Sequence, residues 1–88
     1  MPTIRPSKRF IKAYSQVPYH IQLKIDKALQ LLAKDPRHPS LQTKPVQRAI
    51  GIYEALVVQS FRLTYERLPG DVSQLRVVGK HDETLTNP

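Results

Sequence analysis

The sequence predicts a small α+β domain in which two helices pack on one face of an antiparallel sheet. Apolar residues recur at helical spacing in the first half of the chain, and they alternate with polar residues in the second half. The chain has 88 residues, of which 40% are hydrophobic, so we interpret residues 1–88 as a single domain with a real core. At that size we expect any chemistry on an open face or in a shallow groove.

The first half carries the signals of a short strand and two helices. We expect the strand at residues 3–5, just before Pro6, and Ser7 is a good N-cap for the first helix. The apolar face of that helix is formed by Phe10, Ala13, Tyr14 and Val17. Pro18 separates it from the second helix, whose apolar stripe is Ile21, Ile25, Ala28, Leu29 and Leu32. Leu23 lies off this stripe, so it packs on the first helix or faces a partner.

A proline-rich loop over residues 35–45 leads to three strand-like runs, at residues 51–58, 61–66 and 74–79. We expect them to form a C-terminal three-stranded meander, with a type II turn at residues 68–71. The alternation predicts Leu63 opposite Ala55 and Val77, and Arg62 opposite Leu56 and Val78.

This register divides the sheet into a core face and a second face. We expect the second face to be open, basic and partly apolar, with Glu54, Arg62, Thr64, Arg76 and Lys80 around Ile52, Leu56 and Val78. His81 follows directly at the end of the sheet.

The charge balance points to an anionic partner. The chain has 14 Lys and Arg against 7 Asp and Glu, a net charge of +7, which favours a polyanion or an acidic protein; the alternative is that the charge only aids solubility. The absence of Cys excludes disulfides, thiolate zinc sites and Cys nucleophiles, and the three His are not at metal-site spacing, so we expect no metal or cofactor. We find no signal core and no run able to span a bilayer, and we expect a cytoplasmic protein without membrane contact.

Three segments, in this order and at this length, resemble the RelE/ParE superfamily of bacterial type II toxins: D-P-R-H-P-S-L-Q-T-K-P-V from residue 35, F-R-L-T-Y from residue 61 and V-G-K-H-D-E from residue 78. The resemblance implies a small cognate antitoxin as partner. It also implies a ribosome-dependent, metal-independent mRNA endonuclease that inhibits translation, with mRNA in the ribosomal A site and ribosomal RNA as further partners. The alternatives are a ParE-like toxin that inhibits gyrase without nuclease activity, or a catalytically degenerate module that binds its antitoxin.

In the cleaving branch, the ribose 2′-hydroxyl attacks the adjacent phosphate, which requires a base, an acid and positive charge on the phosphorane. We expect His81 to be the acid or base, since an imidazole exchanges protons near neutrality; the alternative is that it caps the strand end and touches Asp82. The resemblance implies Arg62 as the clamp on the scissile phosphate, the alternative being an ion pair with Glu54 or Glu66. Glu54 is either the general base or an orienting group for Arg62.

The predicted RNA contacts are Lys80, Arg76, Lys44 and Arg48, with Lys80 alternatively a solvated lysine at the rim. Two departures from the superfamily motivate the degenerate alternative. Leu56 stands where some relatives carry a His or Lys, and residues 84–88 lack the aromatic that stacks on a base. We also expect the C-terminal helix of some members to be absent.

Overall fold

A five-stranded sheet with helices on both faces forms the domain, and the computed structural model describes residues 3–88. The elements in chain order are β1 (Thr3–Arg5), α1 (Lys8–Ser15), α2 (Tyr19–Lys34), the 3-10 helix η1 (Pro39–Leu41), β2 (Lys44–Pro45), β3 (Ile52–Val58), β4 (Phe61–Leu68), β5 (Val72–Lys80) and α3 (His81–Thr86). The strand order is β1-β5-β4-β3-β2, with β1 parallel to β5 and all other pairs antiparallel. The predicted fold class is confirmed, and β2 and α3 add to it.

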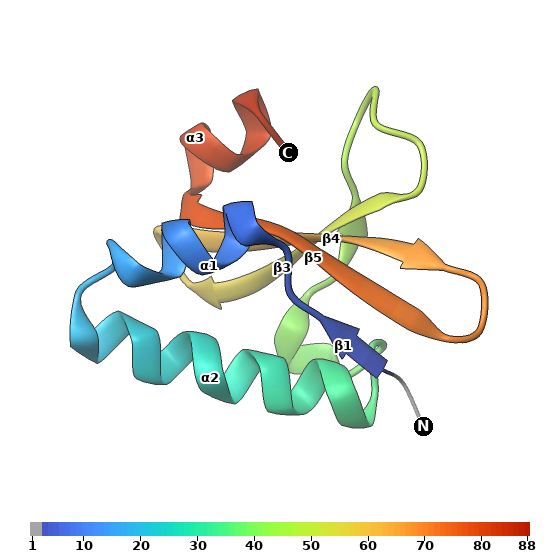
Figure 1. Cartoon of the computed structure of the whole chain (residues 1–88), viewed down its shortest axis with the longest axis horizontal. Helices are drawn as coiled ribbons and strands as arrows, with labels where there is room; N and C mark the ends of the chain where they lie inside the picture. The colour runs from blue at the N-terminus through green and yellow to red at the C-terminus, as the bar shows by residue number, and fades with distance from the viewer. Residues whose placement is uncertain (1–2) are drawn as a thin grey trace.

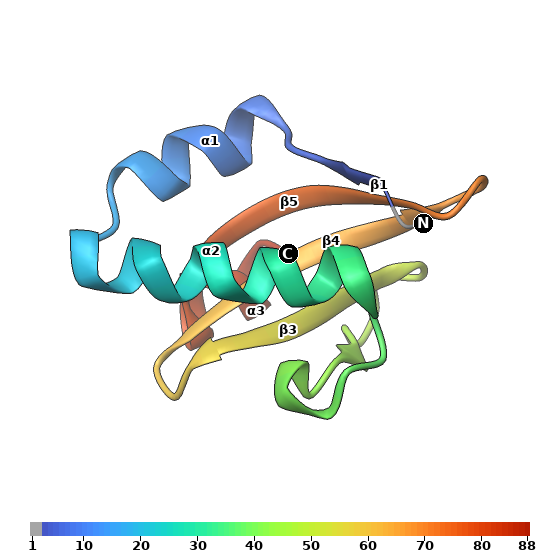
Figure 2. The same cartoon turned by 90° about the horizontal axis from the view of Figure 1, so that it is seen from below.

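The helices begin where the sequence indicates. The Ser7 hydroxyl accepts a hydrogen bond from the Phe10 amide at 3.1 Å, as expected of an N-cap, and donates to the main-chain oxygen of Arg76 at 3.3 Å. Helices α1 and α2 cover one face of the sheet, whereas α3 lies on the opposite face (Figures 1 and 2). Ser7 therefore ties the start of α1 to β5.

The main core lies between α1, α2 and the sheet. Helical and η1 side chains meet those of the sheet there: Phe10, Ile25, Ala28, Leu32 and Leu41 against Ala55, Leu63, Tyr65, Leu75 and Val78. The predicted stripe of the second helix is thus confirmed at its centre. Leu23 lies outside this core with half of its surface exposed.

The register between β3 and β4 is the predicted one, but that between β4 and β5 is not. Leu63 lies opposite Ala55, whereas on the other side it pairs with Val78, not Val77, and Arg62 pairs with Gly79, not Val78. A β-bulge causes this shift: Thr64 pairs with Val77 and Tyr65 with Leu75, which leaves Arg76 as an extra residue. Val78 consequently lies in the core and not on the second face.

The second face is covered, contrary to the prediction. Glu54 and Thr64 are buried, at 2% and 0% exposure, and the predicted absence of a C-terminal helix is wrong because α3 lies over this face (Figure 1). Gly79 of β5 lies directly beneath α3, since a Cβ there would stand 3.5 Å from the Glu83 carboxylate and 3.8 Å from Thr84, both ordinary contact distances. Among residues 3–88, no helix has the length and apolarity to cross a bilayer.

Candidate functional site

A groove of 490 Å³ opens between the loop after β2 and α3. Its walls come from three parts of the chain: Lys44, Pro45, Val46, Gln47 and Arg48 from β2 and the loop, Glu54 from β3, and His81 and Leu85 from α3. Four of the seven predicted site residues therefore line this one groove: His81, Glu54, Lys44 and Arg48. The walls formed by Pro45, Val46, Gln47 and Leu85 were not predicted, because no pattern marks a two-residue strand, a loop or a six-residue helix as part of a site.

Glu54 and Lys44 form an ion pair in this groove. They face each other across the β2–β3 ladder, and Lys44 Nζ lies 3.4 Å from Glu54 Oε1. The Glu54 side chain is only 3% exposed, whereas that of Lys44 is 66% exposed. A carboxylate at the base of the groove thus has a cation beside it that still reaches solvent and can attract an anion.

His81 is the first residue of α3, and its main chain is fixed at both ends. Its amide donates to the Ser60 carbonyl at 3.0 Å, and its carbonyl accepts from the Thr84 hydroxyl at 2.9 Å. The half-buried imidazole makes no hydrogen bond within residues 3–88, so the predicted alternative contact with Asp82 is not formed. The ring is available to a ligand in the groove.

Arg62 does not line the groove, and the predicted ion pair with Glu54 or Glu66 is not formed within residues 3–88. Its Nη1 instead donates to main-chain oxygens of the β3–β4 turn, at 2.7 Å (Val58), 2.9 Å (Gln59) and 3.0 Å (Phe61). The irregular pairing after Leu56 in β3 lies next to this turn. Nε and Nη2 make no hydrogen bond within the described residues, so one side of the guanidinium remains open. The turn that holds Arg62 also receives the His81 amide, so both residues are anchored at the same end of the sheet.

The remaining predicted residues lie in different places. Arg48 lines the groove with a left-handed backbone, φ +64°, that a non-glycine residue seldom adopts. Lys80 lines another hollow, beside Glu83 and α1, and Arg76 contacts Glu66 and Pro88. Their contacts with RNA stay predictions.

Residues 3–88 contain no group of three or more His, Asp or Glu side chains arranged to hold a metal ion. A clear pKa shift is found at Tyr14, far from the groove along the chain. Tyr14 donates a hydrogen bond to Asp26 at 2.8 Å, which raises the pKa of the phenol above its usual 10.0, and desolvation adds to the shift.

No protein-family model matches the chain, and a search of curated proteins finds no match. Solved structures do match it over nearly its whole length. YafQ from E. coli strain BL21(DE3) has a TM-score of 0.77 at 19% identity, covering 96% of this chain and 98% of YafQ. A chain of the RelB-RelE antitoxin-toxin complex from Methanococcus jannaschii has a TM-score of 0.75 at 21% identity, and the match covers 96% of this chain and 99% of that one. A chain of the intact E. coli RelBE toxin-antitoxin complex has a TM-score of 0.72 at 18% identity, and the match covers 91% of this chain and 96% of that one. The resemblance to the superfamily is thereby confirmed for the fold.

Proposed function

We propose that this chain, which has the fold of the RelE-like toxins, is the toxin of a type II toxin-antitoxin system and cleaves mRNA on the ribosome without a metal ion. The observation that carries the proposal is the groove in which His81 and Glu54 lie together with two cations, Lys44 and Arg48. Two proton-transfer groups and positive charge are the parts that phosphodiester cleavage by a neighbouring hydroxyl requires.

In the proposed reaction, the carboxylate of Glu54 accepts the proton of the 2′-hydroxyl as its oxygen attacks the adjacent phosphorus. His81 donates a proton to the 5′-oxygen as the P–O bond breaks, so the products are a 2′,3′-cyclic phosphate and a free 5′-hydroxyl. Lys44 stands beside Glu54 and stabilises negative charge that develops in the groove. His81 and Glu54 are the catalytic residues of this scheme.

Arg62 supplies the clamp on the phosphorane in this proposal. Its Nη1 bonds hold the guanidinium against the turn that also anchors His81, while Nε and Nη2 remain able to bind a phosphate as a fork. Arg48 and Lys80 extend the positive charge on either side of His81 and contact the RNA backbone.

The antitoxin partner is supported by two observations. The matched structures include chains solved as toxin-antitoxin complexes, RelB with RelE and DinJ with YafQ. The net charge of +7 also favours an acidic partner. Co-expression of the open reading frame next to this gene is expected to relieve growth arrest, and failure of every neighbouring frame to do so would contradict an adjacent antitoxin gene.

Primer extension on a reporter mRNA in a reconstituted translation reaction tests the enzymatic part. We expect new 5′ ends within codons that require ribosomes and that His81→Ala abolishes. His20→Ala is the matched control, because His20 lies exposed on α2 and outside the groove. For the cations, Arg48→Asn is preferable to alanine, since Asn tolerates the left-handed backbone, and we expect it to raise KM with little change in kcat.

An uncut message refutes the nuclease. If the protein then inhibits purified gyrase, the ParE-like alternative holds. If it does neither and still binds its antitoxin tightly, the degenerate binding module is the correct reading.

A further inference from the structure

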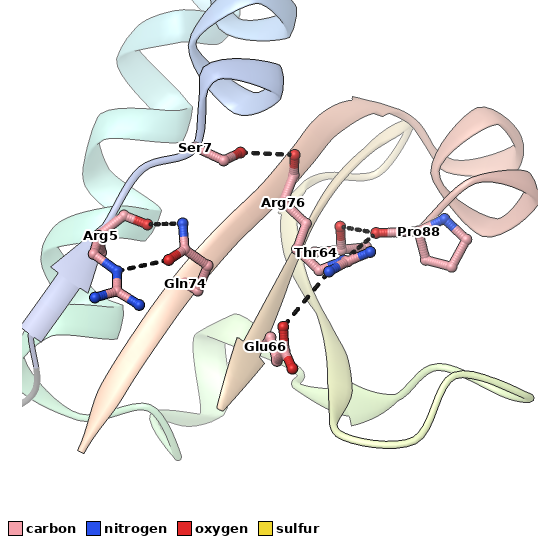
Figure 3. A network of polar contacts seen from close by, with 7 residues as sticks. All are labelled: Arg5, Ser7, Thr64, Glu66, Gln74, Arg76 and Pro88. Atoms are coloured by element: carbon pink, nitrogen blue, oxygen red, sulfur yellow. Dashed lines mark hydrogen bonds and ion pairs between the residues drawn. The ribbon is translucent and has the colours of Figure 1, made fainter. Parts of the chain in front are cut away.

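The segment that follows α3 is fastened to the sheet by two side chains that share one acceptor. The main-chain oxygen of Pro88 accepts a hydrogen bond from the Thr64 hydroxyl at 3.1 Å and another from Arg76 Nε at 2.9 Å (Figure 3). Next to it, the main-chain oxygen of Asn87 accepts from Arg9 of α1. The two residues that follow α3 are thus held by side chains of β4, β5 and α1.

The β-bulge brings the two donors to the same oxygen. Because Thr64 pairs with Val77 and Tyr65 with Leu75, Arg76 is the unpaired extra residue of β5, and bulges commonly redirect such a side chain. Glu66 holds the Arg76 guanidinium at 3.6 Å, and Ser7 donates to the Arg76 carbonyl, as Figure 3 shows. Arg76 is therefore fixed on both its main chain and its side chain.

Helix α3 depends on these contacts for its place. A helix of six residues, His81–Thr86, has too few internal hydrogen bonds to persist alone, so tertiary contacts decide where it lies. Within α3, Thr84 is buried at 1% exposure. Thr64 on the sheet is fully buried, so the Thr64 hydroxyl has no solvent partner to replace Pro88. Since α3 begins with His81 and carries Leu85 into the groove, the fastening at its far end governs one wall of the candidate site.

We propose that Thr64 and Arg76 are positioning residues for the candidate nuclease centre: their convergent hydrogen bonds to Pro88 hold α3 against the sheet and so keep His81 in the groove with Glu54. The catalytic consequence rests on the proposed function, whereas the effect on His81 does not. Arg76 acts here through α3 and not as an RNA contact, the role that the sequence predicted for it.

The test uses two variants that remove a donor and keep its bulk, Thr64→Val and Arg76→Met. The controls keep a donor or remove an unrelated one: Thr64→Ser retains the hydroxyl, and Arg5→Met removes a guanidinium that binds Gln74 at the other end of β5. Because Arg76 is partly exposed, Arg76→Met is expected to fold even if Thr64→Val does not.

The first readout is the NMR signal of the histidine rings in the free protein. We expect the His81 ring signal to shift and broaden in Thr64→Val and Arg76→Met, with His20 and His38 unchanged and both controls like the wild type. The second readout is cleavage kinetics. We expect kcat to fall about tenfold with KM within about twofold, because misplacing a catalytic group weakens the chemical step more than binding.

An unchanged His81 signal in both donor-removing variants overturns the inference, whatever the cleavage rate. A rise in KM alone for Arg76→Met also overturns it, since that result identifies Arg76 as an RNA contact. If the wild type does not cleave mRNA, the proposed function fails, and the histidine signals alone decide whether Thr64 and Arg76 hold His81 in place.

Discussion

Replacing Lys44 with methionine should destabilise the fold, because the buried carboxylate of Glu54 then has no cation beside it. The two charges lie 3.4 Å apart, and at an effective dielectric constant of 20 that separation corresponds to about 5 kcal/mol. Two thirds of the Lys44 side chain is exposed, however, so water screens the attraction, and exposed ion pairs contribute only about 0–1 kcal/mol.

Removing one partner of a fully buried pair costs about 3–5 kcal/mol. The Lys44–Glu54 pair has one buried and one exposed member, so we expect Lys44→Met to lower the free energy of unfolding by about 1.5 kcal/mol, between these limits. For a domain of this size that loss corresponds to a fall in Tm of about 6–12 °C.

A double-mutant cycle measures the pair itself. Lys44→Met, Glu54→Gln and the double variant are unfolded in urea and followed by circular dichroism. We expect a coupling energy of about 1 kcal/mol, which diminishes with added salt. Lys24→Met is the matched control, because Lys24 is exposed and forms no ion pair within residues 3–88; its variant is expected to stay within about 0.5 kcal/mol of the wild type.

A coupling energy indistinguishable from zero would refute the reasoning. It would mean that water entering the groove, and not Lys44, satisfies the carboxylate. Lys44 would then be free to contact RNA without loss of stability, and Glu54 would lose its assigned neighbour in the proposed reaction.

Three further predictions concern the stability of the fold. Ser7→Ala should cost about 1 kcal/mol of unfolding free energy in urea titrations, because the Phe10 amide loses its cap; an unchanged midpoint would contradict this. Gly79→Ala should be neutral or stabilising by about 0.5 kcal/mol, since a Cβ there makes only ordinary contacts with α3, and a loss of α3 amide protection in hydrogen exchange would show otherwise. The raised pKa of Tyr14 means that the stability from its bond to Asp26 is complete below pH 10 and is lost as the pH rises through the folded-state pKa. The difference in urea midpoint between wild type and Tyr14→Phe should therefore shrink above pH 10, and a constant difference would contradict the assignment.

Helices α1 and α2 and strands β3, β4 and β5 could be predicted because each carries a repeated pattern over several residues. Ile25, Ala28 and Leu32 recur at helical spacing and are buried, and the cap at Ser7 is local chemistry that does not depend on the rest of the fold. The β4–β5 register could not be predicted, since an alternating pattern does not reveal that a β-bulge inserts an extra residue into β5. The bulge moved Val78 into the core and freed Arg76 for another role.

The candidate site was predicted in its residue types more than in its contacts. His81, Glu54, Lys44 and Arg48 lie in one groove, yet the Lys44–Glu54 pair depends on a strand of two residues that has no recognisable periodicity. Arg62 contacts carbonyls of a turn whose course follows from the irregular end of β3. Such contacts arise from tertiary structure, and no local pattern of residues encodes them.

The pairing of β1 with β5 has a consequence for how the chain folds as it is synthesised. Contacts such as Arg5 with Gln74 join residues 69 positions apart, so the sheet edge can close only after β5 has been translated. Until then α1, which packs mainly on β5, has no strand to cover, although β3 and β4 are already available to α2. The groove needs both the loop after β2 and α3, which follows β5 in the chain, so a chain synthesised only as far as β5 carries no assembled site. The ribosome that makes the protein is thus shielded from its proposed activity until translation of the domain is complete.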